Sequence, residues 1–303
     1  MQASKLASGI RKADRRALAN AITIAENDAA GGAALLKLLK PPRTAFIVGV
    51  TGPPGTGKST LVDRLIERYR KKGLRVGVIA VDPTSPITGG ALLGDRIRMA
   101  DHAGDKGVFI RSMASRGWSG GLSRATTQAI QLMDAAGFDL IFLETVGIGQ
   151  ADIEVVGVSH AVLVVLMPGL GDDVQMSKAG LMEVGDVYVV NKSDIEGADL
   201  MVVSLLGMVK GVKSRSPAVL KVSALSGEGL DKLEDSIESI RSRFDAGTLD
   251  LKLSSIKGMV IETARGDMMQ RFGRVSDSKA EKLAKLVLAG KLTVSEAAAK
   301  LAR

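Results

Sequence analysis

The sequence has 303 residues, a formal net charge of +8 and no cysteine, and 46% of its residues are hydrophobic, enough for a sizeable core. The lack of cysteine excludes disulfides, cysteine-ligated zinc and thiol nucleophiles, and dispersed basic residues with only 3% aromatics give no support to a nucleic-acid partner. No apolar run approaches the ~20 residues that span a bilayer, and no signal-peptide pattern opens the chain, so we expect a cytoplasmic protein with no membrane partner.

Residues 1–42 are predicted to form a helical extension. Asp14–Asn27 carries apolar residues at helical spacing, and a second, shorter helix over Ala33–Lys40 should end at the two prolines that follow it. We expect this extension to pack against the main domain rather than to have a separate binding function.

From residue 43 to residue 245 the sequence alternates apolar strands with helix-length segments, which is the pattern of βαβ units. Such units form a mostly parallel sheet with helices on both faces, so the expected fold class is α/β, a three-layer αβα domain. Ligands of these sheets bind at the carboxyl ends of the strands. The expected strands are Ala45–Val50, Arg75–Val81, Val108–Ile110, Leu140–Leu143, Ala161–Met167, Val187–Val190 and Val219–Val222, and the clearest helices are Leu61–Lys72, Leu122–Ala136 and Leu230–Arg243.

Residues 246–303 are predicted to form a helical tail without further strands. Lys279–Leu288 repeats Leu, Lys and Ala, and Thr293 and Glu296 have the spacing of a capping box that opens a last helix ending at Ala302. Such a tail either supplies a surface for dimerisation or for a partner, or packs on its own domain. The sequence leaves both readings open.

The most informative stretch fits the phosphate-loop pattern G-x-x-x-x-G-K-[ST] and lies between an expected strand and an expected helix, as that pattern requires. Its glycines let backbone N–H groups surround a phosphate, and the following helix adds its positive end. Lys58 would reach the β- and γ-phosphates, and the hydroxyl of Ser59 would bind Mg²⁺. The residues expected to bind the nucleotide here are Gly52, Pro53, Pro54, Gly55, Thr56, Gly57, Lys58, Ser59 and Thr60.

Acidic residues near the ends of strands are candidate partners of the metal ion. Glu144 ends an apolar strand and Gly147 follows three residues later, where phosphate-loop proteins bind Mg²⁺ and contact the γ-phosphate. Asp82 and Asp95 follow the second strand and are further Mg²⁺ candidates, and Asp82 could also orient water. In the alternative reading Asp82 forms a turn before Pro83 and Asp95 caps a helix.

Residues that follow later strands are typical of a guanine site. Asn191, Lys192 and Asp194 form the pattern N-K-x-D, in which the carboxylate accepts two hydrogen bonds that guanine can donate and adenine cannot. The next strand is followed by an S-A-L loop, whose backbone N–H would contact the guanine oxygen. Together with the phosphate loop, these motifs predict GTP or GDP, with Mg²⁺, as the ligand. The loop residues are Ser223, Ala224 and Leu225.

Two other loops are expected near the same edge of the sheet. Arg111–Leu122 is rich in Gly and Ser and is either a partner surface or an inert connector. Pro168–Asp173 follows a strand, and Lys178 just beyond it could reach the ligand, although a solvated lysine is the commoner outcome. His102 and His160 are isolated, so we expect local packing or solvation for them rather than metal binding.

These residues together resemble one family of P-loop GTPases of the SIMIBI class, the MeaB/MMAA group of G-protein chaperones of adenosylcobalamin-dependent acyl-CoA mutases. The group also carries the label ArgK, of an arginine/ornithine transport kinase. The resemblance covers about residues 10–240. The matching text is R-R-A-L-A-N-A-I-T (15–23), V-G-V-T-G-P-P-G-T-G-K-S-T-L (48–61), A-V-D-P-T-S-P (80–86), G-D-R-I-R-M (94–99), F-I-R-S-M-A-S-R-G (109–117), E-T-V-G-I-G-Q (144–150), P-G-L-G-D-D-V-Q (168–175) and V-V-N-K-S-D (189–194).

The resemblance implies roles that spacing alone does not provide. Asp82 and Asp95 match acids tied to Mg²⁺ and to the first switch loop, and Glu144 matches the second switch. Residues 168–178, with Lys178, match a third switch loop that signals the nucleotide state to the mutase.

The resemblance therefore implies a Mg²⁺-dependent GTPase that forms a homodimer and binds an adenosylcobalamin-dependent mutase, expected to be methylmalonyl-CoA mutase. Hydrolysis would gate cofactor loading or protect the enzyme. The family usually has a longer helical dimerisation arm, often with aromatics, whereas residues 246–303 are short and aromatic-poor. This departure bears on the geometry of a dimer.

Three alternatives remain open. A metal-insertion GTPase of urease or hydrogenase maturation would need Cys or His ligands, and the absence of cysteine argues against it. A kinase of a transport system or small molecule is disfavoured by N-K-x-D. A nucleotide-regulated binding protein would bind the same ligand without depending on its hydrolysis.

Overall fold

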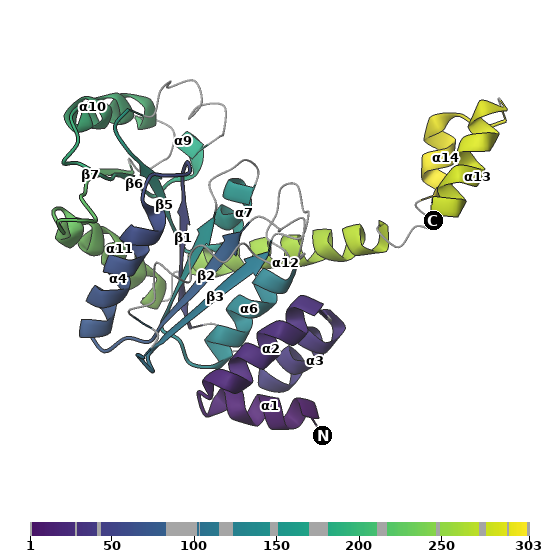
Figure 1. Ribbon diagram of the computed structural model, residues 1–303, viewed down its shortest axis with the longest axis horizontal. Helices are drawn as coiled ribbons and strands as arrows, with labels where there is room; N and C mark the ends of the chain where they lie inside the picture. The colour runs from purple at the N-terminus through teal and green to yellow at the C-terminus, as the bar shows by residue number, and fades with distance from the viewer. Residues whose placement is uncertain are drawn as a thin grey trace.

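A computed structural model describes residues 2–27, 29–40, 44–82, 102, 104–114, 124–145, 151–169, 181–210, 217–246, 249–272, 277–289 and 291–301. At its centre is a seven-stranded sheet in the order β3-β2-β4-β1-β5-β6-β7, and every pairing in it is parallel. Helices cover both faces of this sheet (Figure 1). The chain therefore has the predicted three-layer αβα architecture.

The observed elements follow the predicted alternation closely. The strands are β1 (Phe46–Thr51), β2 (Val76–Asp82), β3 (Val108–Ala114), β4 (Leu140–Thr145), β5 (Ala161–Leu166), β6 (Val187–Val190) and β7 (Ala218–Lys221). The helices are α1 (Gln2–Arg11), α2 (Arg15–Asn27), α3 (Ala29–Leu39), α4 (Lys58–Lys71), α6 (Arg124–Ala135), α7 (Ala151–Val158), α9 (Leu181–Val184), α10 (Ala198–Val209), α11 (Leu230–Asp245), α12 (Leu249–Phe272), α13 (Asp277–Leu288) and α14 (Val294–Leu301).

Successive residues of each strand belong to two different apolar cores, because their side chains point to opposite faces of the sheet. Phe46, Val48 and Val50 of β1 lie in the core beneath α4 and α11. Ile47 lies in the core beneath α2, α3, α6, α7 and α12. Since β1, β4 and β5 are buried along their whole length, their sequences are continuous apolar runs rather than alternating patterns.

The N-terminal residues form three helices that pack against the sheet through α6. Leu18 and Ile22 of α2 and Leu35 of α3 are buried in the core that these helices share with α6. Two of the three helices lie where the sequence predicts helices. The third helix, α1, also lies within the predicted helical extension, although the sequence did not predict its bounds; Ala7 and Ile10 of α1 are buried.

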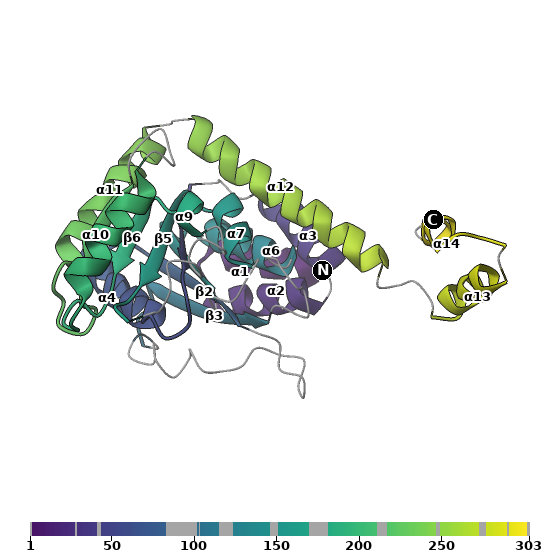
Figure 2. The same ribbon diagram turned by 90° about the horizontal axis from the view of Figure 1, so that it is seen from above.

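The C-terminal tail, which was predicted to be helical, begins with α12, a continuous helix of 24 residues whose bounds the sequence did not predict. Its apolar residues lie both on the buried side, at Met259, and on the exposed side, at Leu253, Val260 and Met268. The usual one-sided period is therefore missing from its sequence. Figure 2 shows α12 running past α7 and α6, with α13 and α14 lying apart beyond its end.

The tail helices α13 and α14 agree with the prediction, including the capping box between them. The backbone N–H of Thr293 donates to Glu296 Oε2 at 2.8 Å, and the N–H of Glu296 donates to Thr293 Oγ1 at 3.2 Å. These reciprocal bonds satisfy two backbone donors at the start of α14. Among the described residues, no helix is both long enough and apolar enough to cross a membrane.

Two glycines allow α12 to cross α7 at backbone contact. A Cβ atom placed on Gly258 of α12 would lie 1.6 Å from the carbonyl oxygen of Gly157 in α7. Nearby, His160 accepts a hydrogen bond at Nδ1 from the backbone N–H of Ile47 at 2.9 Å, and its Nε2 lies 2.8 Å from the hydroxyl of Ser255 in α12. Because Nδ1 is the acceptor, Nε2 carries the proton and donates to Ser255. His160 is thus a packing residue, as the sequence analysis expected.

The Gly258→Ala variant should be destabilised, because the new methyl group meets backbone that cannot move without separating the two helices. We expect a loss of about 1–3 kcal/mol in the free energy of unfolding, measured by urea denaturation. Gly207→Ala is the matched control, since Gly207 is also helical and a Cβ there meets nothing within 4 Å. That variant should gain up to about 1 kcal/mol from helix propensity. Equal effects of the two substitutions would contradict the close crossing.

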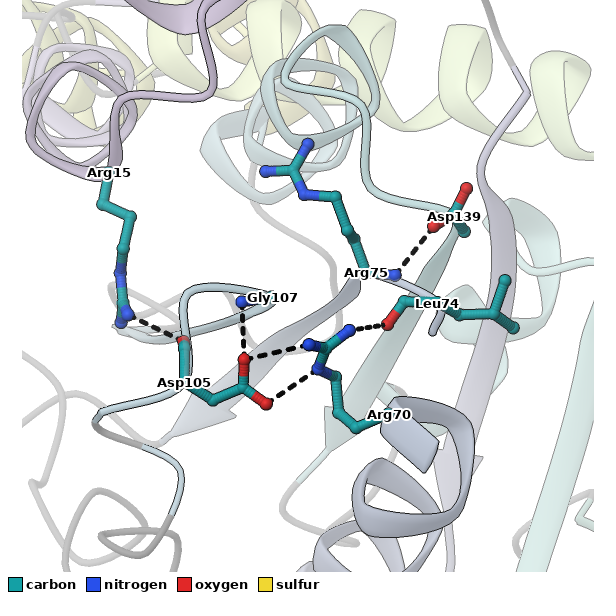
Figure 3. Close-up of polar contacts among 7 residues, drawn as sticks. All are labelled: Arg15, Arg70, Leu74, Arg75, Asp105, Gly107 and Asp139. Atoms are coloured by element: carbon teal, nitrogen blue, oxygen red, sulfur yellow. Dashed lines mark hydrogen bonds and ion pairs between the residues drawn. The ribbon is translucent and has the colours of Figure 1, made fainter. Parts of the chain in front are cut away.

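At the amino-terminal edge of the strands, an arginine–aspartate pair connects α4, α2 and the segment before β3 (Figure 3). Arg70 donates from Nε to Asp105 Oδ2 at 2.8 Å and from Nη2 to Asp105 Oδ1 at 3.0 Å. The N–H of Gly107 donates to the same carboxylate at 2.7 Å, and Arg15 of α2 donates to the carbonyl of Asp105 at 2.9 Å. Hydrogen bonds from Arg70 and Gly107 hold the pKa of Asp105 below its ordinary value.

The Asp105→Asn variant should lose about 1–2 kcal/mol of unfolding free energy at pH 7, because a charge-assisted bidentate contact becomes neutral. Asp105 has a lowered pKa in the folded state, so its contribution is present above the unfolded value and disappears as the pH falls through the folded value. Wild type and variant should therefore converge in acid below the ordinary pKa of 3.8. Asp245→Asn, at an exposed carboxylate 3.8 Å from Arg241, is the control and should change little. A constant difference down to acid pH would contradict the assignment.

Candidate nucleotide-binding site

The predicted phosphate loop connects β1 to α4 at the carboxyl edge of the sheet. Its backbone needs glycine at two points in particular. Gly52 has a φ of 133°, and a Cβ there would lie 2.0 Å from the carbonyl oxygen of Val165 in β5. Gly57, the residue before α4, has a φ of 88°, and its Cβ would lie 2.4 Å from the side-chain nitrogen of Asn191. The loop is therefore folded tightly against the strand and loop beside it.

Lys58, the first residue of α4, is directed back over the phosphate loop. Its side chain is buried, and Nζ donates to the carbonyl oxygens of Gly52 at 2.7 Å and Pro53 at 3.0 Å. Thr56 also donates from its hydroxyl to Pro53 at 3.0 Å. The ammonium group thus lies within the loop, beside the positive end of a 14-residue helix. This arrangement attracts an anion.

Ser59 and Glu144 meet beside the phosphate loop, although 85 residues separate them in sequence. The hydroxyl of Ser59 donates to Glu144 Oε1 at 2.7 Å, and both residues are buried. Parallel pairing places Glu144 of β4 opposite Val50 of β1 and opposite Ala80 of β2. A hydroxyl and a carboxylate are oxygen ligands of the kind that Mg²⁺ prefers, so these residues fit that ion. In the described part of the chain, no group of three or more His, Asp or Glu could hold a metal ion.

The other predicted switch residues are described only in part. Asp82 is the last residue of β2, two positions beyond the Ala80 that pairs with Glu144. The register thus places its backbone at the same edge of the sheet. Asp95, Gly147 and Lys178 lie outside the described residues, as do 115–123 and 170–180 from the other two loops that the sequence singled out. The first of these loops was predicted to begin at Arg111, which is wrong, because β3 continues to Ala114.

Asn191 connects the phosphate loop to both base-reading loops. It is buried, its Nδ2 donates to the carbonyl of Thr56 at 2.8 Å, and its Oδ1 accepts the N–H of Ala224 at 3.0 Å. Lys192, next in the chain, has a φ of 55°, an uncommon conformation for a side chain other than glycine. The side-chain amide of Asn191 therefore holds together three segments that are distant in sequence.

Asp194 is exposed and is held by the neighbouring loop. The hydroxyl of Ser223 donates to Asp194 Oδ1 at 2.8 Å, and this bond orients the carboxylate. Leu225, at the end of the S-A-L sequence, has 78% of its surface exposed. A planar carboxylate can accept paired N–H donors from a base, and an exposed leucine on the loop that holds the carboxylate can contact the ring. The structure thus brings together the predicted N-K-x-D and S-A-L residues.

Sequence reasoning missed two groups at this site. The hydroxyl of Thr145, directly after Glu144, lies 3.3 Å from the hydroxyl of Thr51, directly before Gly52. The phosphate loop and the segment of Glu144 are therefore in contact where they leave their strands. Arg64 of α4 donates from Nε to the carbonyl of Ala224 at 3.1 Å. A possible sequence signal for the threonines is that each adjoins a motif, whereas nothing local marks Arg64.

Comparison of the sequence with known proteins relates the chain to one family of GTPases. The family described as "Methylmalonyl Co-A mutase-associated GTPase MeaB" matches residues 18–273. A protein of Pyrococcus abyssi whose name describes it as a GTPase is 45% identical over 320 residues, covering 96% of this chain and 99% of its own. The GTPase ArgK of Escherichia coli is 37% identical over 249 residues, covering 78% of this chain and 75% of its own. The crystal structure of an LAO/AO transport system kinase superposes with a TM-score of 0.69 at 26% identity, covering 99% of this chain and 96% of its own.

The Asn191→Ala variant should bind GDP at least about tenfold more weakly, because it leaves two buried backbone groups without their partner and frees the loops on either side. The measurement is a titration with a fluorescent GDP analogue. Ser193→Ala is the control from within the same four-residue motif, because its hydroxyl has no hydrogen-bond partner among the described residues. Wild-type affinity in the Asn191 variant would show that this amide does not organise the site.

Proposed function

We propose a function for this chain from the family to which it belongs, the MeaB family of methylmalonyl-CoA mutase-associated GTPases. As a GTPase of this family, it hydrolyses GTP to GDP and phosphate. The finer proposal is that it acts as a chaperone of an adenosylcobalamin-dependent acyl-CoA mutase, methylmalonyl-CoA mutase in the first instance. Hydrolysis would gate the loading of the mutase cofactor or protect the enzyme.

The observation that supports the proposed site most is the pair of hydrogen bonds made by Asn191. Because one amide contacts both the loop of Thr56 and the loop of Ala224, the phosphate-binding and base-reading motifs are close together, as a site for one nucleotide would require. In this site Asp194 would accept the N1–H and N2–H of guanine. Lys192 would pack its aliphatic stem on the base.

The same residues suggest how hydrolysis proceeds. Backbone N–H groups of residues 52–60 and the start of α4 would hold the phosphates, while water attacks the γ-phosphate in line with the leaving group. Lys58 would leave its two carbonyl acceptors for the β- and γ-phosphates and neutralise the charge that develops there. Mg²⁺, when bound, supplies further neutralisation of that charge. Ser59 and Glu144 would hold the ion, with Asp82 and Asp95 as further candidates, and Asp82 could orient the attacking water.

The contact between Ser59 and Glu144 also offers a way to report the nucleotide state. Glu144 is the first residue of the E-T-V-G segment, and α7, which α12 crosses, follows that segment in the chain. Loss of the γ-phosphate from the site would change what Glu144 and Gly147 contact and so the segment that leads to α7. Residues 168–178, with Lys178, would form a third switch loop that meets the mutase.

The rest of the proposed arrangement follows the three predicted parts of the chain. Residues 43–245 would form the GTPase domain, 1–42 its helical extension and 246–303 a tail for dimerisation or for the partner. The protein would work as a homodimer in the cytoplasm, without a nucleic-acid or membrane partner.

Kinetics with the purified chain and a purified adenosylcobalamin-dependent methylmalonyl-CoA mutase test the proposal. Neither a glutamine nor an arginine finger is placed by the sequence, so we expect slow hydrolysis alone and faster hydrolysis with the mutase. Retention of the mutase on immobilised chain should differ between GTP and GDP. Lys58→Ala should abolish the acceleration. Fast turnover that ignores the mutase would contradict the chaperone role, and phosphate found on an acceptor, rather than free in solution, would favour a kinase.

A further inference from the structure

The peptide between Ala224 and Leu225 is held on one side by a residue that no motif contains. Arg64 of α4 donates from Nε to the carbonyl oxygen of Ala224 at 3.1 Å, although 160 residues separate the two. Arg64 also lies 3.4 Å from Glu67, one turn further along the same helix. Its guanidinium is thus placed between a helix neighbour and the base-reading loop.

The loop around this peptide is otherwise braced by its own bonds. The N–H of Ala224 donates to Asn191 at 3.0 Å, the N–H of Gly227 donates to the carbonyl of Ser223 at 2.8 Å, and the N–H of Ser223 donates to Glu228 at 3.0 Å. Within the described ranges, Arg64 is the only donor to the Ala224 carbonyl, and the N–H of Leu225 has no protein acceptor.

A peptide unit is planar and trans, so its C=O and N–H point in opposite directions. When Arg64 holds the Ala224 carbonyl toward α4, the N–H of Leu225 in the same plane must point away from α4. A cationic donor on the carbonyl also polarises the peptide, which makes that N–H a stronger donor. Ser223, directly before Ala224, donates a hydrogen bond to Asp194, and Asp194 is the side chain proposed to read the base.

We propose that Arg64 is a positioning residue for base recognition, which orients the Ala224–Leu225 peptide so that the Leu225 N–H donates to the carbonyl oxygen O6 of guanine. The inference rests on the proposed guanine site and names one determinant of its selectivity. Adenine carries an amino group where guanine carries O6, so an N–H held at this position disfavours adenine as it favours guanine.

The helix that carries Arg64 also carries the phosphate-binding lysine. Lys58 and Arg64 are six residues apart on α4, which corresponds to about 9 Å along a helix axis. One rigid helix thus contacts the loop for the phosphates at its first residue and the loop for the base less than two turns later. It sets the distance between the two ends of the nucleotide site.

The test compares three diphosphates by competition with a fluorescent GDP analogue. GDP and inosine diphosphate carry O6, whereas the diphosphate of 2-aminopurine riboside lacks it. Arg64→Ala should weaken GDP and inosine diphosphate by a similar factor, about three- to tenfold, and should change 2-aminopurine riboside diphosphate by less than about twofold. Arg64→Lys, which keeps one donor, should lose less. An equal loss for all three ligands would overturn the proposal, because a merely structural role weakens every nucleotide alike.

Two further variants separate this inference from the proposed function. Glu67→Gln removes the helix ion pair and leaves the bond from Arg64 to Ala224, so its affinities should match wild type; a loss that matches Arg64→Ala would overturn the proposal. Asp194→Asn should shift preference from GDP to xanthosine diphosphate, which tests the guanine site itself. If Asp194→Asn shifts the preference and Arg64→Ala affects all ligands equally, only the role of Arg64 fails. If Asp194→Asn changes nothing, the guanine site fails, and the inference fails with it.

Discussion

The amide of Asn191 makes two hydrogen bonds on which the geometry of the whole site depends. One fixes the phosphate loop through Thr56, and the other fixes the S-A-L loop through Ala224. Both bonds are buried, where an unpaired backbone group is costly. Moving one of the three loops without the others would break a buried hydrogen bond. Close packing reinforces this restraint, because a side chain on Gly57 would displace the amide.

The sheet provides the fixed frame behind these loops. All pairings are parallel, so the carboxyl ends of β1, β2, β4, β5, β6 and β7 lie at one edge, and every loop discussed for the site leaves from that edge. The opposite edge is stabilised separately by Arg70 and Asp105, which connect α4 to the segment before β3. Helix α4 therefore contacts the site through Lys58 and Arg64 and the opposite edge through Arg70. It is the element that connects the nucleotide site to the rest of the domain.

The second connection runs through α7 and α12. The segment after Glu144 leads into α7, which meets α12 at Gly157 and Gly258, while Ser255 of α12 contacts His160 just before β5. In the proposed switch, a change at the γ-phosphate end of the site would reach α12, the first helix of the C-terminal tail, through α7. This path is short because two glycines allow backbone contact.

The sequence by itself determined the α/β class, the approximate bounds of the strands and the motifs around Lys58, Glu144, Asp194 and Ser223. These are local signals, because apolar strands, turn glycines and loop motifs are patterns of residues that are neighbours in the sequence. Only the tertiary structure decided that Ser59 meets Glu144, that Asn191 joins two loops and that Arg64 holds the Ala224 carbonyl. The bonded residues are between 33 and 160 residues apart in sequence, and no local pattern encodes these contacts. For the same reason the sequence predicted a helical tail but not the bounds of α12, because its exposed and buried sides are both apolar and only its packing on α7 distinguishes them.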